Sequence, residues 1–503
     1  MQGLKRNNLI TLLILIILLS IGFFYRIYGL NVNYSFWTDE EHVAIFSRAI
    51  LERGKPVLAN GYSAGAYQWL QYWLSAISAK IFGLNEFAVR LPSVIFGVLT
   101  IWATYFFGKE LFNKKIGLLA AFFITFLKIE ILWSRQARPY QALQFFFVLG
   151  AWFIYRLAKE EKFKWRYFSG FLTCGVLASL MHGLGLVFLF NGFLYLLLSY
   201  FSCFKKQIVV VWGKGITFLW VTISLLVFLS FAYSLHSMVS SIILSLGEVR
   251  NSFYYRVFLW HNYSLLVFLS LIGILFQIFQ KKKSWLILFL FLAIQGIIVS
   301  LFLPQPFVRY LYIVFPFLIL FSAVGLVEIS HRIVKISNFK NLILIFLAFF
   351  IVAMGNKFTL LPQRIYSLNE DMQEIPEVDW KKIYGFAEEK LVQNGDAILV
   401  TNWTDLPVWF LGEKELSYLL RRDSFVKIDS FTGAKVVTDL TGFREIVQKE
   451  KKGLIIIDSW DNYVPDGVRE YAKEDLKKEL EIDRLYFVQP RLWPVEIYSW
   501  GLD

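Results

Sequence analysis

The chain has 503 residues, of which 57% are hydrophobic. Several apolar runs reach the roughly 20 residues that cross a bilayer, so the composition excludes a wholly water-soluble protein. The net charge of +13 combines two opposite parts. Residues 1–365 carry 33 basic and 11 acidic side chains, whereas 366–503 carry 18 and 27. Because the basic excess belongs to the apolar part, it indicates membrane topology and lipid contact, and it argues against nucleic-acid binding.

The apolar runs predict a polytopic α-helical membrane protein with about eleven transmembrane helices. The first run, 9–30, has no small-residue cleavage site, so we interpret it as an uncleaved span. The loop 31–86 follows, and we expect it to hold two helices along the membrane surface, over 38–52 and 66–82. The other spans are expected at 88–107, 116–132, 139–157, 167–181, 183–203, 215–236, 263–280, 284–303, 309–329 and 341–361.

The loops between these spans differ in basic charge. Those on one side hold 19 Lys and Arg, and the short loops on the other side hold five. The positive-inside rule therefore predicts a cytoplasmic N-terminus in the cell membrane. With an odd number of spans, the C-terminal region is extracytoplasmic. The basic segments are 1–8, 108–115, 156–166, 203–214, 281–283 and 331–340.

From about residue 366 the composition becomes that of a soluble domain. Short apolar runs at 397–400 and 454–457 predict buried strands, and 441–451 and 466–480 predict amphipathic helices. The sequence thus predicts a transmembrane domain over 1–365 and a small extracytoplasmic α/β domain over 366–503. The two cysteines, Cys174 and Cys203, lie in apolar runs and predict no disulfide framework.

An acidic cluster follows the first span. Asp39, Glu40 and Glu41 precede His42 in the first outer loop. Charge beside hydrocarbon is costly, so such a cluster indicates chemistry or ion binding. A structural alternative is that Thr38 and Glu41 form a capping box at the start of a helix.

Other polar residues fall on the same predicted face. A sugar transferase acting on a phosphate-linked lipid needs a base for the acceptor hydroxyl and cations for the leaving phosphate. Each residue also has a structural alternative: an arginine beside a span can reach headgroups, a buried acid can pair with a cation, and a histidine can be a core residue. The candidates are Arg90, Glu130, Arg135, Arg138, Tyr140, His182, Arg309 and Tyr310.

Four segments appear in an order that resembles the GT-C membrane glycosyltransferases. They are 36–42, 90–97, 134–140 and 307–310, and the resemblance covers about 1–330. The nearest branch is similar to the prokaryotic relatives of protein O-mannosyltransferase and of the aminoarabinose transferase that modifies lipid A. The resemblance implies a GT-C-like fold, a polyprenyl- or dolichyl-phosphate sugar donor and inverting transfer at the outer face. The acceptor could be a lipid, a glycan or a protein.

The resemblance also implies roles for residues. Asp39 would be the catalytic base and Glu40 its neighbour in the acidic pair. The donor phosphate would be bound by Arg90, Arg138, Tyr140, Arg309 and Tyr310. Some members of the group use a divalent metal ion, for which His182, Glu130 and His42 are the candidates here, or they could contact phosphate. The second acidic motif of the protein O-mannosyltransferases is reduced to Glu130 in this sequence.

Two other functions remain open from the sequence. A transporter or flippase of lipid-linked glycans would carry ionisable residues near the bilayer midplane and broken helices. A non-catalytic scaffold would present the outer domain, but it leaves the polar residues of the outer face without a role. The predicted clustering of these residues at one face favours the transferase.

Overall fold

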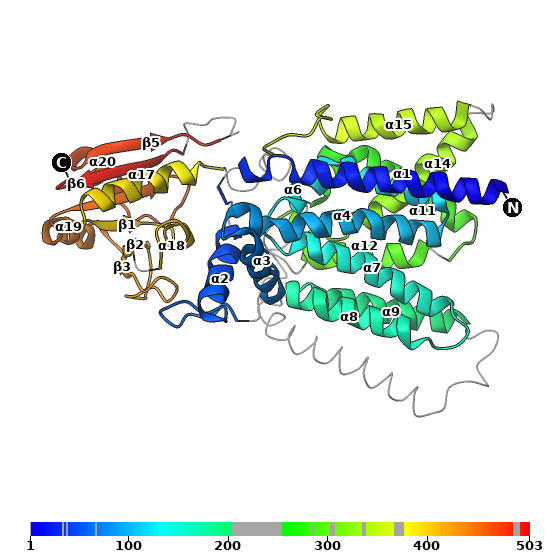
Figure 1. Ribbon diagram of the computed structural model, residues 1–503, viewed down its shortest axis with the longest axis horizontal. Helices are drawn as coiled ribbons and strands as arrows, with labels where there is room; N and C mark the ends of the chain where they lie inside the picture. The colour runs from blue at the N-terminus through cyan, green and yellow to red at the C-terminus, as the bar shows by residue number, and fades with distance from the viewer. Residues whose placement is uncertain are drawn as a thin grey trace, which may run out of the picture. The chain divides into compact units, whose positions relative to one another are not determined.

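The computed structural model describes residues 2–32, 35–36, 39–65, 68–203, 254–283, 285–301, 307–333, 339–366, 377–413, 415–485 and 493–502. The chain forms two compact units (Figure 1). A helical unit consists of Met1–Tyr28 and Ser93–Gln363, and a mixed unit consists of Gly29–Pro92 and Arg364–Asp503. The first loop, 31–86, therefore groups with the C-terminal region and not with the helical unit.

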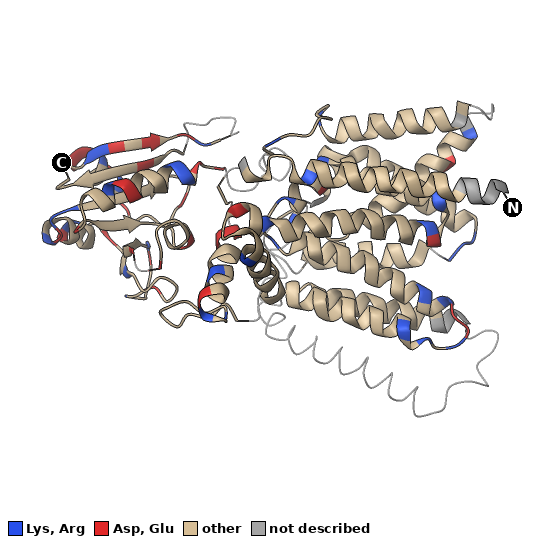
Figure 2. Cartoon of the chain, viewed as in Figure 1, with Lys and Arg blue, Asp and Glu red and all other residues tan. Residues whose placement is uncertain are grey.

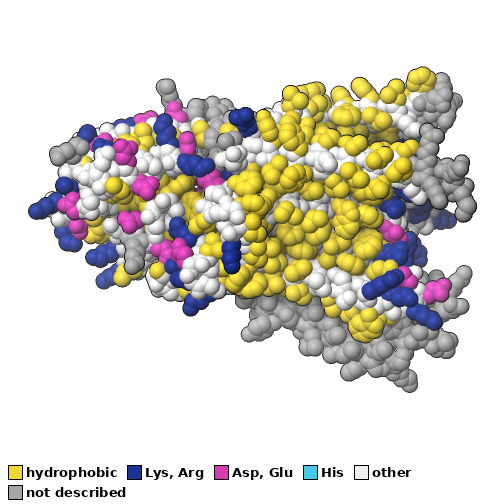
Figure 3. Space-filling view, viewed as in Figure 1, with side chains coloured by type: hydrophobic (Ala, Val, Ile, Leu, Met, Phe, Trp, Pro, Cys, Tyr) yellow, Lys and Arg dark blue, Asp and Glu magenta, His cyan; other side chains and the backbone are white. Residues whose placement is uncertain are grey.

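The helical unit contains long apolar helices that expose hydrophobic side chains on their outer sides. Leu9, Leu12 and Leu13 of the first helix are 50–56% exposed, and hydrophobic side chains cover the visible face of this unit (Figure 3). Among the described residues, five helices are long and apolar enough to cross a membrane, or six if one bent pair is a single span. The protein is therefore a multi-pass membrane protein, and the predicted count of eleven spans is not confirmed.

The described residues of this unit form a series of helices. They are α1 (Gln2–Ile27), α4 (Glu86–Leu111, which starts in the mixed unit), α5 (Lys114–Phe126), α6 (Lys128–Ser134), α7 (Tyr140–Lys159), α8 (Trp165–Met181), α9 (Gly185–Cys203), the π-helix η2 (Tyr254–Asn262), α11 (Tyr263–Phe279), α12 (Trp285–Leu301), α13 (Arg309–Tyr312), α14 (Phe315–Ile333) and α15 (Lys340–Gly355).

Two of the predicted spans are wrong in detail. The span expected at 116–132 is broken at Leu127, where α5 and α6 meet at a bend of 64°. The span expected at 309–329 begins with the short helix α13, which is separate from α14. The stretch 167–203 does divide into two helices near His182, as predicted. The span expected at 215–236 lies outside the described residues.

Helices α11 and α14 pack with their backbones in contact. A Cβ atom added at Gly325 would lie 2.0 Å from the carbonyl oxygen of Leu269, and one at Gly273 would lie 2.2 Å from that of Phe321. Small residues at helix crossings allow this close approach in membrane proteins, where van der Waals packing replaces the hydrophobic drive.

The described parts of the predicted basic segments lie at one end of the helical unit (Figure 2). At this end Arg156 donates to Glu110 across 2.8 Å, and Lys115 lies 3.5 Å from His331. Lys114 also contacts Asn8 near the start of α1. These contacts bring together side chains from four of the predicted basic segments, which agrees with the common side of the membrane that the topology gives them. The four segments are 1–8, 108–115, 156–166 and 331–340.

The mixed unit is built on a six-stranded sheet of order β3-β2-β1-β4-β6-β5. The first four strands in this order are parallel, and β6 and β5 are antiparallel to their neighbours. This confirms the C-terminal α/β domain. The strands are β1 (Ile398–Thr401), β2 (Leu416–Leu420), β3 (Lys435–Val437), β4 (Gly453–Asp458), β5 (Lys477–Ile482) and β6 (Val495–Trp500).

Helices cover both faces of this sheet. Alternate residues of β4 explain the arrangement: Leu454 and Ile456 pack with α17 (Trp380–Gln393) and α18 (Asp405–Phe410), whereas Ile455 and Ile457 pack with α19 (Leu440–Lys449) and α20 (Val468–Asp475). The helix expected over 466–480 is too long. It ends at Asp475, and the following residues form the edge strand β5.

The two helices predicted in the first loop are present as α2 (Glu40–Arg53) and α3 (Trp69–Phe82). They belong to the mixed unit because polar contacts tie the loop to the C-terminal residues. Arg48 donates to the carbonyl oxygens of Val408 at 2.5 Å and Trp409 at 3.2 Å. Lys381 pairs with Glu86 at 2.7 Å. These polar contacts connect the first loop to the C-terminal region.

Candidate functional site

Asp39 occupies the position immediately before α2 with an unusual backbone. Its φ angle is +56°, and its side chain makes no capping hydrogen bond to the helix. A left-handed conformation in a residue other than glycine costs on the order of 1 kcal/mol or more and persists only where the surroundings enforce it. The predicted capping box is wrong in register, because Asp39 and not Thr38 is the N-cap. Thr38 itself lies outside the described residues.

Glu40 and Arg90 form a buried ion pair. The Nε atom of Arg90 lies 2.9 Å from Oε1 of Glu40, and Nη2 lies 3.0 Å from Oε2. Each residue is 1% exposed, and the guanidinium group also lies 4.9 Å from the ring of Phe36. Such a two-pronged pair satisfies both carboxylate oxygens. The geometry therefore favours a structural role for Glu40 and Arg90 over the predicted roles in catalysis and phosphate binding.

His42 lies one helical turn beyond Asp39. Its Nδ1 atom is 3.1 Å from the hydroxyl of Tyr72, and its ring stacks on Phe431 at 5.8 Å with an angle of 18° between the planes. Burial lowers the pKa of His42, although the carboxylates of Asp405 and Asp39 act to raise it. Burial likewise raises the pKa of Asp405, against the effect of His42. Sequence reasoning missed Asp405, which no motif distinguishes.

The predicted donor-side residues come together in the helical unit. The rings of Tyr140 and His182 lie 5.5 Å apart, and Tyr310 lies 6.2 Å from each of them. The guanidinium carbon of Arg309 is 5.7 Å from the ring of Tyr140 and 5.4 Å from that of Tyr310. Residues from three separate helical segments thus form one aromatic and cationic cluster, in agreement with their common predicted face.

The remaining arginines of this face separate into two kinds. Arg138 is fully buried, and its guanidinium carbon lies 5.8 Å from the ring of Trp133, which in turn contacts Tyr140 at 5.4 Å. Arg138 therefore continues the cluster. Arg135 instead donates to the carbonyl oxygens of Arg26 at 3.0 Å and Tyr28 at 2.7 Å. That contact satisfies the end of α1, which is a structural role.

Glu130 is the buried acid of a second network, in the short helix after the break at Leu127. Its carboxylate accepts hydrogen bonds from Tyr312 at 2.8 Å and Gln144 at 3.2 Å. Gln141 donates to Gln144 at 2.9 Å. Sequence reasoning missed Tyr312 and both glutamines. The glutamines carried a usable signal, since two amides three residues apart in an apolar helix lie on one face.

The metal-binding candidates do not form a set of ligands. In the described part of the chain, no three His, Cys, Asp or Glu side chains lie close enough together to hold a metal ion. His182 belongs to the aromatic cluster, Glu130 to the glutamine network and His42 to the mixed unit. The three predicted ligands are therefore not brought together into one metal site in the described residues.

The acidic and cationic parts of the candidate site belong to different units. Asp39 lies in the mixed unit, and Arg138, His182 and Arg309 lie in the helical unit. Their predicted convergence on one cavity stays a prediction. Within each unit, the geometry supplies one part of a transfer site: a carboxylate at a strained helix start, and guanidinium groups among aromatic rings that can receive a phosphate.

Comparisons with known proteins agree with this picture. A family model described as dolichyl-phosphate-mannose-protein mannosyltransferase matches residues 69–229. The chain is 24% identical over 180 residues to the putative mannosyltransferase YkcB of Bacillus subtilis, covering 34% of this chain and 24% of that protein. It is 23% identical over 204 residues to the undecaprenyl phosphate-alpha-4-amino-4-deoxy-L-arabinose arabinosyl transferase of Wigglesworthia glossinidia brevipalpis, covering 40% and 35%. The matches thus span about a quarter to a third of these relatives.

Solved structures share the fold over nearly the whole chain. ArnT from Cupriavidus metallidurans in the apo state has a TM-score of 0.58 and 13% identity, with 98% of each chain covered. The archaeal oligosaccharyltransferase AglB from Archaeoglobus fulgidus, in complex with an inhibitory peptide and a dolichol-phosphate, has a TM-score of 0.56 and 15% identity, with 89% of this chain and 69% of that chain covered. The family model and the relatives match parts of the chain, the solved structures share its fold, and all of them agree with the resemblance to the GT-C membrane glycosyltransferases found in the sequence.

Proposed function

We propose that this protein transfers a sugar from a polyprenyl- or dolichyl-phosphate carrier to an acceptor hydroxyl at the outer face of the membrane, with inversion. The observation that carries the proposal is the arrangement at the start of α2. There, Asp39 is held in a strained conformation while both oxygens of Glu40 are bonded to Arg90. The donor type is supported by a structure of ArnT from Cupriavidus metallidurans bound to undecaprenyl phosphate, with a TM-score of 0.55 and 14% identity.

The residues have separate roles in this proposal. Asp39 removes the proton of the acceptor hydroxyl as the new glycosidic bond forms. Arg138 and Arg309 stabilise the negative charge that develops on the leaving phosphate, because guanidinium groups form charge-assisted hydrogen bonds with phosphate oxygens. Glu40 holds Arg90 and thereby fixes the first turn of α2 beside Asp39.

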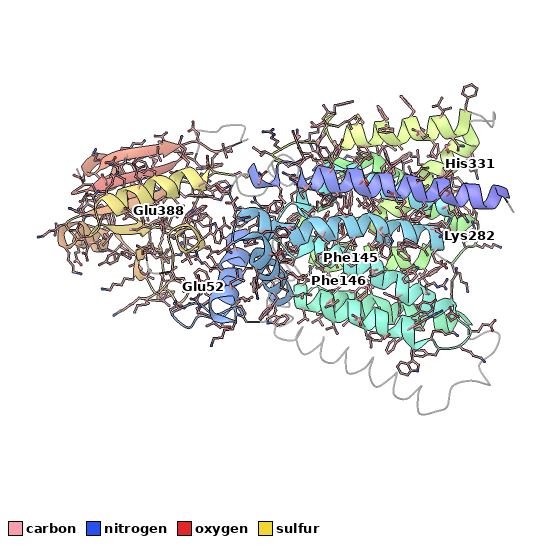
Figure 4. All side chains as sticks on the ribbon, in the orientation of Figure 1. Glu52, Phe145, Phe146, Lys282, His331 and Glu388 are labelled. Atoms are coloured by element: carbon pink, nitrogen blue, oxygen red, sulfur yellow. The ribbon has the colours of Figure 1, made fainter. Side chains whose placement is uncertain are left out.

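The test is an Asp39→Asn variant in reconstituted membranes, with a panel of polyprenyl-phosphate sugars as donors. The change keeps the shape of the side chain and removes the base, so we expect turnover to fall by roughly 10²–10⁴-fold while donor binding is retained. Glu52→Gln is the matched control, since Glu52 is an exposed acid on the same helix (Figure 4). Near-normal turnover of Asp39→Asn would refute the assignment of the base.

One feature favours the second candidate, a transporter of lipid-linked glycans. The break between α5 and α6 lies beside the buried acid Glu130, and broken helices with polar groups are typical of transporters. The two functions differ in their products. A transferase forms a new glycosidic bond in detergent solution, whereas a flippase only moves a labelled lipid across the bilayer of a vesicle and forms no product.

The proposal includes an orientation. With the N-terminus in the cytoplasm, the end of the helical unit that holds Arg138 and Arg309 faces outward. The mixed unit is then extracytoplasmic, where an acceptor of the cell envelope would meet it. The partners are the lipid-linked donor, the membrane and an acceptor of lipid, glycan or protein type.

A further inference from the structure

The C-terminal domain has an open groove at the β6–β5 edge of its sheet. The groove has a volume of about 820 Å³, which is within the range of small-molecule sites. Strands β6 and β5, helix α20 and the loop after β4 supply its lining. The lining residues that matter here are Asn462, Lys473, Lys478, Trp493, Glu496 and Tyr498.

A buried acid lies at the base of this groove. Glu496 is 3% exposed and is the second residue of β6, a strand in which every residue is buried. Its Oε1 atom accepts hydrogen bonds from Tyr498 and Lys478, each at 2.9 Å. A buried glutamate with fixed donors around it is costly unless it is paired. The sheet therefore keeps a charged residue at a buried position where an apolar side chain would cost less free energy.

The charges of the groove balance one another. Its cations are Arg469, Lys473 and Lys478, and its acids are Glu470, Glu481 and Glu496. Lys478 bonds to Glu481 and Glu496, and Lys473 lies 3.9 Å from Glu496. An anion would have to displace these carboxylates from the lysines. A neutral ligand with many hydroxyls can instead donate to the acids and accept from the ammonium groups.

The position of the groove agrees with a binding role. In this sheet β4 lies on the opposite side of β1 from β2 and β3, and ligands of open parallel sheets bind outside the carboxyl ends of the strands. Ser459 and Asn462 follow β4 directly and line the groove. Lysines on an edge strand also prevent edge-to-edge pairing, but that role requires neither the ring of Trp493 nor a buried glutamate.

We infer that this groove binds a neutral saccharide portion of the acceptor. Trp493 offers a ring for the apolar face of a sugar, and Asn462, Glu496 and the lysines offer donors and acceptors for its hydroxyls. The identification of this saccharide as the acceptor rests on the proposed transferase function. It narrows the acceptor from a lipid, glycan or protein to a molecule that carries a glycan.

Saccharide binding by the full chain in nanodiscs tests the inference. The probes are neutral trisaccharides of mannose, galactose and N-acetylglucosamine, with inorganic phosphate as the anionic comparison, and saturation-transfer NMR is the readout. We expect at least one trisaccharide to bind, and Trp493→Ala and Asn462→Ala to weaken it by tenfold or more. Phosphate should not displace it. Two exposed helix glutamates form a matched pair: Glu470→Ala in the groove should weaken binding, and Glu388→Ala on α17 should not (Figure 4).

The results separate this inference from the proposed function. Asp39→Asn should lose transfer and keep saccharide binding, and Trp493→Ala should raise the KM for the acceptor with kcat unchanged. If no trisaccharide binds, or if the groove variants bind as the wild type does, the groove is not a saccharide site even where transfer is intact. If saccharide binds but Asp39→Asn transfers normally, the proposed mechanism is wrong, and the inference that the groove binds a saccharide remains supported.

Discussion

The pair between Glu40 and Arg90 gives the most direct test of the structure. Glu40→Gln removes the charge of the carboxylate and leaves the guanidinium group of Arg90 buried beside a neutral amide. The amide oxygen can accept only part of the two hydrogen bonds of 2.9 and 3.0 Å. If the pair is structural, the loss should appear first in stability and only secondarily in turnover.

The magnitude follows from burial. Removal of one partner from a buried ion pair costs about 3–5 kcal/mol, because the remaining charge has lost its counter-charge in a low dielectric. Glu86 lies 3.5 Å from Nη1 of Arg90 and retains some compensation. We therefore expect a loss near the lower end, about 3 kcal/mol. The double variant Glu40→Gln with Arg90→Met removes both charges and should recover most of this loss.

Pulse proteolysis of the full chain in increasing urea measures these losses as free energies of unfolding for the mixed unit. Glu52→Gln is again the control, since an exposed substitution on the same helix should change stability by less than about 0.5 kcal/mol. Wild-type stability in Glu40→Gln together with abolished transfer would refute the structural role. It would return Glu40 to the catalytic role that the sequence predicted.

Three further outcomes are expected. Gly325→Ala should destabilise the helical unit by about 1–3 kcal/mol, because the added methyl group overpacks α11 against α14. Gly385→Ala is the control and should be neutral or stabilising, because a Cβ atom at this position of α17 meets open space. Thermal unfolding measures both variants, and equal effects would contradict the close contact between α11 and α14. Burial lowers the pKa of His42 in the folded chain. Below pH ~6.5 the unfolded chain therefore binds more protons than the folded chain, so stability should fall as pH decreases through that range. His42→Gln should flatten the dependence of the melting temperature on pH, and an unchanged dependence would count against the effect of burial. An impermeant thiol reagent on intact cells should label Lys427→Cys and not Lys162→Cys, and the reverse pattern would invert the topology.

The sequence by itself determined the class of the protein. Long apolar runs can form only a few structures in a bilayer, and charge counts along the loops carry topology, so both are local properties that can be read without a fold. Helices α2 and α3 and strands β1 and β4 were also predictable, because their residue patterns agree with their final surroundings. The cluster of Tyr140, Arg309 and Tyr310 was expected from their common face.

Only the tertiary structure decided the partners of the polar residues. Glu40 and Arg90 are fifty positions apart in the sequence, and no spacing rule predicts that they neutralise each other. The same holds for the contact of Arg48 with α18 and for the effect of Asp405 on His42. Local sequence sets which side chains are charged, but the packing of distant segments sets which charges are paired with each other, as in Glu40 and Arg90.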